Sequence, residues 1–335
     1  MMRNKIKKKF AVALIVIFAI NVSCSSSKEA PVNTSKINKK VYVVSDSLIV
    51  WDDALHFLVF GDWGRKGDYH QQDVADRMEE AAKLIDAEFV IALGDNFYPN
   101  GVASVHDPNW MFSYENIYKG YHLEIPWYVV LGNHDYRGNP QAQVDYTKIS
   151  QRWNMPSRYY DIEFEDEDTG LNVNFMFLDT SPFEKKYYSE KNYFNVKTQD
   201  STQQIKWIDS TMRVKSKADW TIFSGHHPLY SGGKRLEATE DIRNALSPIL
   251  KRHSADVYFA GHEHDMQYIK PDGKTHHFIS GAGSEVRTTG MIPNISKFAA
   301  SVQGFMAISI TKEKMLVQVI NYKGNVIYST EIDKE

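Results

Sequence analysis

The most constraining feature of the sequence is a short apolar run that ends in a glycine beside a polar residue. This pattern occurs five times along the chain. The runs and the residues that follow them are 55–60 before Gly61-Asp62, 88–93 before Gly94-Asp95, 126–131 before Gly132-Asn133, 220–224 before Gly225-His226, and 256–260 before Gly261-His262. Short apolar runs bounded by turn signals predict buried strands. Because ligands gather beyond the carboxyl ends of strands in α/β sheets, we expect the five polar ends to form one site.

Helical patterns separate several of these predicted strands. Val74, Met78 and Ile85 recur at helical spacing, and a second amphipathic pattern covers 202–214. Strands that alternate with helices indicate βαβ units and an α/β fold. Alternating apolar residues from 305 to 332, with Gly324 between the last two runs, predict a terminal hairpin. We see one α/β catalytic domain over residues 51–335.

The first fifty residues have a different character. A basic start leads into the uninterrupted apolar stretch 10–20, which is too short to span a bilayer comfortably and is typical of a signal peptide. The sequence Asn21-Val-Ser-Cys24 resembles a bacterial lipoprotein signal, so we expect residues 1–23 to be removed and Cys24 to carry a lipid. An ordinary signal peptide or an uncleaved anchor is the alternative, because Asn21 departs from the usual residue. Residues 24–50 are polar and aperiodic, and they predict a flexible tether.

Composition narrows the chemistry of the expected site. Cys24 is the only cysteine, so an acylated Cys24 leaves no thiol to bind a metal, and the site must use oxygen and nitrogen ligands. The formal net charge of −3 and the lack of a broad basic balance make nucleic acid an unexpected partner.

The polar residues at the strand ends are of types that bind metals. Taken singly, a Gly-Asp pair is usually a turn and a lone histidine is usually structural. Together they are difficult to explain by sheet stability, because buried carboxylates and imidazoles need compensation, which metal ions provide. The candidate ligands are Asp62, Asp95, Tyr98, Asn133, His226, His262 and His264.

These blocks together resemble the purple acid phosphatases of the calcineurin-like metallophosphoesterase superfamily, in particular the small tartrate-resistant type. The matching blocks are Asp62-x-Gly64, Gly94-Asp95-x-x-Tyr98, Gly132-Asn133-His134-Asp135, Gly225-His226 and Gly261-His262-x-His264. The similarity extends from about Leu55 to the C-terminal hairpin. It implies a four-layer α/β/β/α sandwich, with two mixed β-sheets flanked by helices.

The resemblance also implies how the ligands are divided between two metals. Asp62, Tyr98 and His264 would bind Fe(III), and Asp95 would bridge the two ions. Asn133, His226 and His262 would bind a divalent ion, which would be Fe, Zn or Mn. An anionic phenolate suits a trivalent ion, and neutral donors suit a divalent one. Tyr98 marks the purple subclass; its alternative is an aromatic side chain packed under the loop.

The implied reaction is hydrolysis of phosphomonoesters by a metal-bound hydroxide, since coordination lowers the pKa of water from 15.7 to about 7. His134 would orient the phosphate and protonate the leaving group. Asp135 would hold His134 through a hydrogen bond, or it would be a turn residue only. His227 would touch the phosphate or line the rim.

The sequence departs from the family at one position. Relatives carry a further substrate-facing histidine beyond the His226 position, where this chain has Ser231-Gly-Gly-Lys-Arg235. Lys234 or Arg235 could supply positive charge but not a readily released proton. The segment 181–200 borders the site in relatives; here a solvated loop is the preferred interpretation.

Three hypotheses about function follow. An exported, lipid-anchored, monomeric acid phosphatase that scavenges phosphate in the periplasm or at the surface of a bacterium is preferred. A phosphodiesterase or nucleotide hydrolase of the same superfamily is the first alternative, which the missing histidine motivates. An iron-dependent redox or binding protein is the second.

Overall fold

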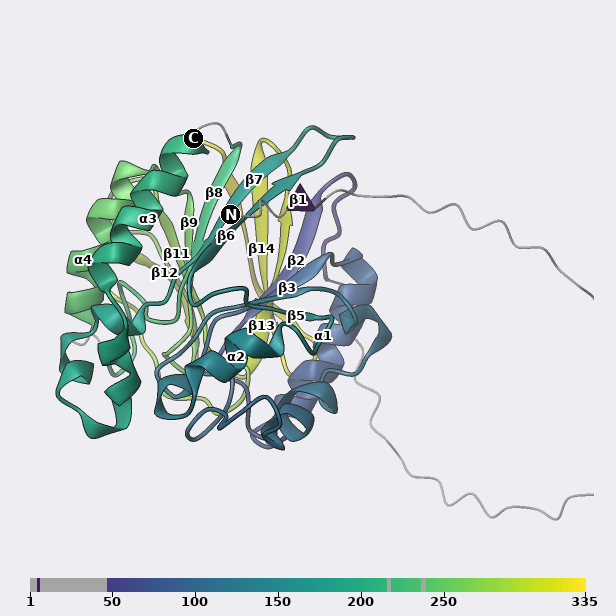
Figure 1. Cartoon of the computed structure of the whole chain (residues 1–335). Helices are drawn as coiled ribbons and strands as arrows, with labels where there is room; N and C mark the ends of the chain where they lie inside the picture. Colours follow the sequence, from purple (N-terminus) through teal and green to yellow (C-terminus); the bar gives the residue numbers. More distant parts are fainter. Residues whose placement is uncertain (1–4, 7–46, 216–217, 236–238) are drawn as a thin grey trace, which may run out of the picture.

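The computed structural model describes residues 5–6, 47–215, 218–235 and 239–335 (Figure 1). Most of the predicted leader 1–23, the predicted lipid site Cys24 and the predicted tether up to residue 46 lie outside the described residues. Within the described part of the chain, no helix combines the length and the apolar composition needed to cross a bilayer.

Two mixed sheets form the centre of the molecule. In the described residues the larger sheet has the strand order β1-β6-β7-β8-β9-β11-β10-β12. Its strands are β1 (Lys5–Ile6), β6 (Tyr160–Glu165), β7 (Asn172–Phe177), β8 (Trp220–Ser224), β9 (Val257–Ala260), β10 (Met266–Ile269), β11 (His276–Ser280) and β12 (Ser296–Ala300). Strands β7, β8 and β9 are parallel neighbours, so their carboxyl ends reach the same edge.

The second sheet has the order β15-β14-β13-β2-β3-β4-β5. Its strands are β2 (Leu55–Phe60), β3 (Phe89–Ala92), β4 (Trp127–Val129), β5 (Trp153–Asn154), β13 (Gly304–Ile310), β14 (Lys314–Asn321) and β15 (Val326–Asp333). Strands β2, β3 and β4 run parallel, and β13 pairs antiparallel with β2. Strands β14 and β15 continue the sheet beyond β13, each antiparallel to its neighbour. The predicted C-terminal hairpin is therefore present, with Gly324 at a φ of 88° in its turn.

Helices cover the outer faces of both sheets (Figure 1). The α-helices are α1 (Gln71–Ile85), α2 (Pro140–Tyr146), α3 (Ser201–Val214) and α4 (Glu240–Arg252). Helices α3 and α4 lie against the larger sheet, and α1 lies against the second. The short 3-10 and π segments are Trp110–Glu115, Tyr121–Leu123, Asp135–Arg137, Ser181–Phe183, Lys185–Tyr188 and Lys191–Thr198. This arrangement confirms the predicted four-layer α/β/β/α sandwich.

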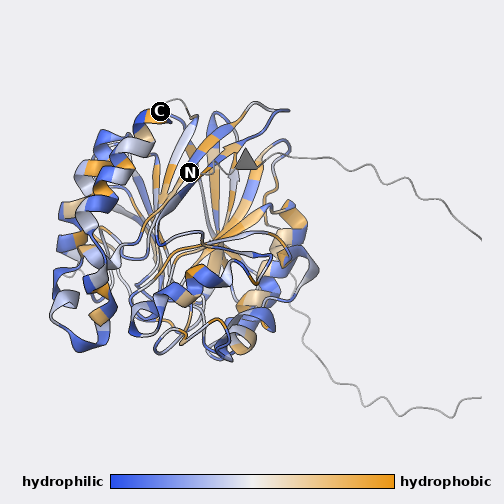
Figure 2. Ribbon diagram, in the orientation of Figure 1, coloured by the Kyte–Doolittle hydropathy of each residue, from blue (hydrophilic) through white to orange (hydrophobic). Residues whose placement is uncertain are grey.

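The central strands β8 and β9 of the larger sheet are buried on both faces. In β9, Val257 and Phe259 pack into the large core between the sheets, while Tyr258 and Ala260 pack against α3 and α4. Apolar colouring accordingly concentrates on the sheets, and polar colouring on the helices (Figure 2). A strand that is covered on both faces appears in the sequence as a continuous apolar run. These segments were therefore recognisable in the sequence.

Candidate metal centre

The predicted ligands follow strands of both sheets and meet between the sheets at one end of the sandwich. Asp62, Asp95 and Asn133 follow β2, β3 and β4, whereas His226 and the pair His262 and His264 follow β8 and β9. Hydrogen bonds between strand ends of the two sheets hold the site together. The backbone N–H of His262 donates to Asp62 Oδ2 at 2.8 Å, and His226 Nδ1 donates to the Leu93 carbonyl at 2.9 Å.

The backbone at the strand ends is held in an unusual conformation. Asp62, Asp95 and His262 have φ values of 59°, 50° and 69°, in the left-handed region that most side chains avoid. Such conformations cost on the order of 1–3 kcal/mol each and tend to persist at functional sites. The glycines are needed for close approach: a Cβ on Gly132 would lie 2.1 Å from the backbone nitrogen of Asp95.

The first half of the site collects acceptor atoms around one phenol. The Tyr98 hydroxyl lies 2.9 Å from Asp62 Oδ1, 3.0 Å from Asp95 Oδ2 and 3.1 Å from His264 Nε2. A phenol has one proton and can satisfy one of these atoms only. The remaining lone pairs face one another in a buried space, so a cation fits this position better than any set of hydrogen bonds.

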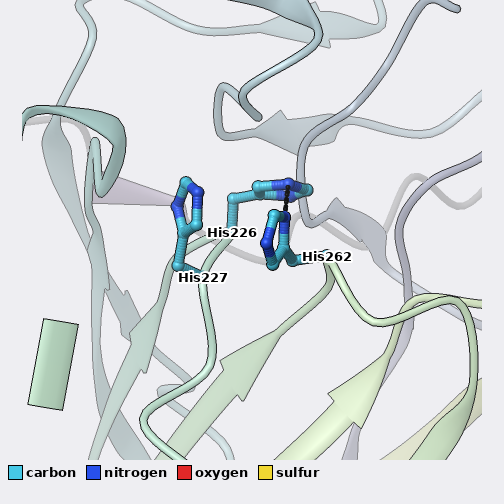
Figure 3. A group of neighbouring side chains, drawn as sticks. All are labelled: His226, His227 and His262. Carbon is cyan, nitrogen blue, oxygen red and sulfur yellow. Dashed lines mark hydrogen bonds between the residues drawn. The ribbon is translucent and has the colours of Figure 1, made fainter. Parts of the chain in front are cut away.

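The second half of the site has the same character. Because His226 Nδ1 is protonated toward the Leu93 carbonyl, its Nε2 faces the centre (Figure 3). That nitrogen lies 3.1 Å from His262 Nδ1, 3.3 Å from Asn133 Oδ1 and 3.4 Å from Asp95 Oδ1. Asp95 thus has one carboxylate oxygen toward each group of donors, so its carboxylate would be within reach of ions held by either group.

The electrostatics of the buried groups show a deficit of positive charge. Burial raises the pKa of Asp62 to about 8, and the neighbouring Asp95 raises it too, against the effect of His226. Burial disfavours a charged His226, but Asp95 outweighs it and raises the pKa of His226 to about 9. Burial lowers the pKa of His264 to about 2 and that of His262 well below its usual range, which keeps both in the neutral form that binds metals.

The donor set therefore fits a pair of metal ions. One group of donors has two carboxylates, a phenol and an imidazole; the other has an amide oxygen, two imidazoles and a share of Asp95. Oxygen-rich anionic sites and nitrogen-rich neutral sites favour ions of different hardness. The structure brings all seven predicted ligands together.

His134 lies at the edge of this centre with one ring nitrogen held by the protein. Its Nδ1 donates to the Pro99 carbonyl at 2.5 Å, its backbone N–H donates to Asp95 Oδ1 at 2.7 Å, and its ring packs on Tyr98 at a centroid distance of 4.5 Å. The Nε2 atom lies 3.9 Å from Asp95 Oδ2 in a side chain that is 16% exposed. It is therefore the ring atom available to a substrate.

Of the two roles predicted for Asp135, the structure supports the turn residue and not the hydrogen bond to His134. The buried carboxylate of Asp135 accepts hydrogen bonds from the backbone N–H groups of Gly132 and Asn96, at 2.8 and 3.1 Å, and from Gln143 Nε2 at 2.8 Å. The Pro99 carbonyl occupies the partner position that we expected Asp135 to fill. Asp135 instead ties the turn after β4 to the turn after β3.

His227 lies beside the ligands but has partners of its own. Its Nδ1 is 2.8 Å from Thr180 Oγ1, and its Nε2 is 3.0 Å from the Tyr187 hydroxyl. Its ring contacts His262 at a centroid distance of 4.4 Å (Figure 3). Its position would allow metal ligation. Because both ring nitrogens face hydroxyl groups, however, neither nitrogen is directed at the centre.

The segment 181–200 is a wall of the site, so the preferred interpretation as a solvated loop is wrong. Tyr187 and Tyr193 are buried and pack against each other at 4.1 Å. The Tyr193 hydroxyl accepts from Asn133 Nδ2 at 3.2 Å and from Arg137 at 2.6 Å. This contact orients the Asn133 amide so that its oxygen faces the centre. The tyrosines of this segment were the available signal, but nothing in their spacing indicated these partners.

The segment that replaces the family's second histidine places one cation near the centre. Arg235 Nη1 donates to the His262 carbonyl at 2.6 Å and lies 3.9 Å from Glu263 Oε1, whereas Lys234 is exposed. Arg235 is therefore the residue of this segment that contacts the site.

Comparisons with known proteins agree with this geometry. The sequence profile of the calcineurin-like phosphoesterase domain matches residues 55–266. The chain is 35% identical over 292 residues to purple acid phosphatase 7 of Arabidopsis thaliana, with 84% of this chain and 87% of the relative covered. It is 29% identical to human tartrate-resistant acid phosphatase type 5, with 84% and 91% covered. Among solved structures, it is similar to GAP50, the anchor in the inner membrane complex of Plasmodium, with a TM-score of 0.72, 27% identity, and 84% and 89% covered.

A buried carboxylate outside the donor set allows a pH prediction. Asp179 accepts from the Tyr136 hydroxyl through Oδ2, and its Oδ1 has no hydrogen-bond partner among the described residues. Burial raises the pKa of Asp179 from 3.8 to about 6. Because the folded pKa is the higher one, the stabilisation is complete below pH 3.8 and is lost as the pH rises through 6.

We therefore expect Asp179→Asn, which cannot ionise, to flatten the pH dependence of stability. Between pH 4 and pH 7 the free energy of unfolding of the parent should fall by about 2 kcal/mol more than that of the variant. Urea unfolding of the metal-loaded proteins measures this difference, with exposed Asp168→Asn as the control. Equal pH slopes for the parent and Asp179→Asn would contradict the assignment.

Proposed function

The chain belongs to the calcineurin-like phosphoesterase family, and we propose that it is a phosphomonoester hydrolase of the purple acid phosphatase type with one ferric and one divalent ion in its binuclear centre. The observation that carries the ferric assignment is the Tyr98 hydroxyl, which meets two carboxylates and His264 within 3.1 Å. A phenolate oxygen is a hard anionic donor of the kind that a trivalent ion favours.

The proposed ligand assignment divides the donors as the geometry does. Asp62, Tyr98 and His264 would hold the ferric ion, and Asn133, His226 and His262 would hold the divalent ion, which would be Fe, Zn or Mn. Asp95 would bridge the two. When bound, such a pair neutralises charge on phosphate oxygens and lowers the pKa of coordinated water, which supplies a nucleophile in mild acid.

The chain's own residues account for positioning and proton transfer. The Pro99 carbonyl fixes the proton on His134 Nδ1, so Nε2 is the atom that exchanges a proton with the substrate. Its neighbour Asn133 is held by Tyr193, and the backbone N–H of His134 is held by Asp95. The imidazole is thereby fixed beside the ligands, where it would protonate the departing alkoxide. General acid catalysis of this kind contributes about 10²–10⁴-fold.

Arg235 would favour anionic substrates through its charge alone, whereas the second histidine of the relatives could also supply a proton. Its guanidinium is anchored on the His262 carbonyl and adds positive charge at the site, but an arginine does not release its proton. The proton for the leaving group must then come from His134. The phosphodiesterase alternative predicts faster turnover of diesters than of monoesters.

We further propose that the protein is exported and attached to a bacterial membrane through a lipid on Cys24. The support is the basic and apolar leader followed by Val-Ser-Cys24 in the sequence. A monomeric phosphatase on a tether at the periplasmic or outer surface would release phosphate from esters outside the cytoplasm.

We predict that His134→Ala lowers kcat for simple phosphomonoesters by about 10²–10⁴-fold with metal content unchanged. The loss should be larger for alkyl phosphates than for aryl phosphates with good leaving groups, because only the former need a proton. Initial rates on a matched series of esters measure this, with exposed His106→Ala as the control. An equal loss across the series would exclude the general-acid role.

Purified metal-loaded protein that releases no phosphate from aryl monoesters, or that prefers diesters, would overturn the proposed function.

We predict that Tyr98→Phe removes the visible charge-transfer band of the iron-loaded protein, because the band requires a phenolate on a ferric ion. Metal analysis and absorption spectra of the natural chain and the variant test this. A band that survives the substitution would exclude Tyr98 as its source. A colourless natural protein that holds only zinc would return the assignment to a phosphoesterase without ferric iron.

We predict that Cys24→Ser moves the protein from the membrane fraction to the soluble fraction of the expressing bacterium. Incorporation of a labelled fatty acid into the natural chain, and its loss in the variant, would measure the modification directly. A natural chain that takes up no label would contradict the lipid anchor without affecting the catalytic assignment.

A further inference from the structure

One cation packs directly on the face of the Tyr98 ring. The Cζ atom of Arg65 lies 3.8 Å from the centroid of that ring, which is contact distance, while its distance to the exposed Tyr69 ring is 5.2 Å. A guanidinium over an aromatic face is attracted by the electrons of the ring, and the attraction is stronger where water is excluded. The Tyr98 side chain is 4% exposed, so this contact is largely shielded from solvent.

Contacts of its backbone and of its side chain fix the position of Arg65. Arg65 follows Gly64, whose carbonyl accepts the backbone N–H of Tyr98 at 3.0 Å. The arginine side chain forms an ion pair with Glu285 at 2.6 Å, and its backbone N–H donates to Gln71 Oε1 at 2.9 Å. Gln71 therefore fixes the backbone of Arg65, and Glu285 fixes its guanidinium against the ring.

Neither the Nε atom of Arg65 nor its ion pair competes strongly with the contact to the Tyr98 ring. Its Nε is buried and has no hydrogen-bond partner among the described residues. Glu285 is 37% exposed and Arg65 is 17% exposed, so the carboxylate is the better solvated member of the ion pair.

We propose that Arg65 is a positioning residue that tunes the Tyr98 ligand; this inference rests on the proposed ferric function. The positive charge of Arg65 stabilises the electrons of the phenolate. It thereby sets the energy of the phenolate-to-iron absorption. A stabilised phenolate gives up electron density less readily, which raises the energy of the transition. Arg65 acts through Tyr98, and neither bond formation nor proton transfer in the reaction requires it.

The test is the visible spectrum of iron-loaded Arg65→Met, which keeps most of the side-chain bulk and removes the charge. We expect the band to move to longer wavelength by roughly 10–20 nm, the size that a cation–π interaction of ordinary strength would produce in a visible band. Arg65→Lys retains a cation and should regain at least half of the shift. Arg243→Met, which removes another arginine that packs over a tyrosine at 5.6 Å, should leave the band in place.

The outcomes separate this inference from the function on which it rests. A natural chain without a visible band overturns the ferric assignment and the inference together. A natural band that stays in place in Arg65→Met, at equal iron content, overturns the inference only. Equal shifts in the Met and Lys variants would show that packing rather than charge is responsible, and would also overturn it. If Arg65→Met does not bind iron, Arg65→Gln provides the uncharged comparison, with the same expected shift.

Discussion

The centre of this protein depends on one electrostatic constraint: more lone pairs converge in a dry space than the available protons can satisfy. Asp62, Asp95 and His264 all meet the single hydroxyl of Tyr98, and His226 Nε2 faces acceptors of its own. Buried carboxylates without compensation are costly. Burial raises the pKa of Asp62 to about 8, so the protein's own groups do not remove the cost of that carboxylate. Burial acts in the same direction on Asp95, but His226 and His134 outweigh it and hold the pKa of Asp95 well below its usual value. The surrounding fold holds an arrangement that becomes favourable when cations bind.

The sandwich makes this arrangement possible because parallel strands end at the same edge of each sheet. Ligands from β2 and β3 in one sheet face ligands from β8 and β9 in the other, and the Asp62 to His262 hydrogen bond joins residues 200 positions apart. The left-handed backbone of Asp62, Asp95 and His262 turns each side chain toward the space between the sheets. The large apolar core between the sheets provides the stability against which this local strain is maintained.

The sequence predicted the parts of the site that local chemistry determines. A buried strand followed by glycine and a polar residue has a local signature, so the fold class and the ligand positions could be inferred. The partners of Asp135 and the burial of Tyr187 and Tyr193 could not be inferred in this way. Asn133 and Tyr193 are 60 residues apart, and their contact depends on how the segment after β7 folds back over the centre. Asp135 had several backbone donors within reach, and no feature of the sequence favours one of them over His134.

The charges of the proposed centre bear on the choice between monoesters and diesters. Asp62, Asp95 and a deprotonated Tyr98 contribute three negative charges, while the other four ligands are neutral in the metal-binding form. A ferric and a divalent ion bring five positive charges, so the ligated pair retains two. The hydroxide of the proposed reaction would carry one negative charge, so one positive charge would remain to balance the substrate. Because the electrostatic energy of a shielded site is large at short range, a further cation beside the ions would decide which substrate charge is balanced. Arg235, which is anchored on the His262 carbonyl, brings this further positive charge, so the total would match a phosphomonoester dianion. It does so without supplying a second acid.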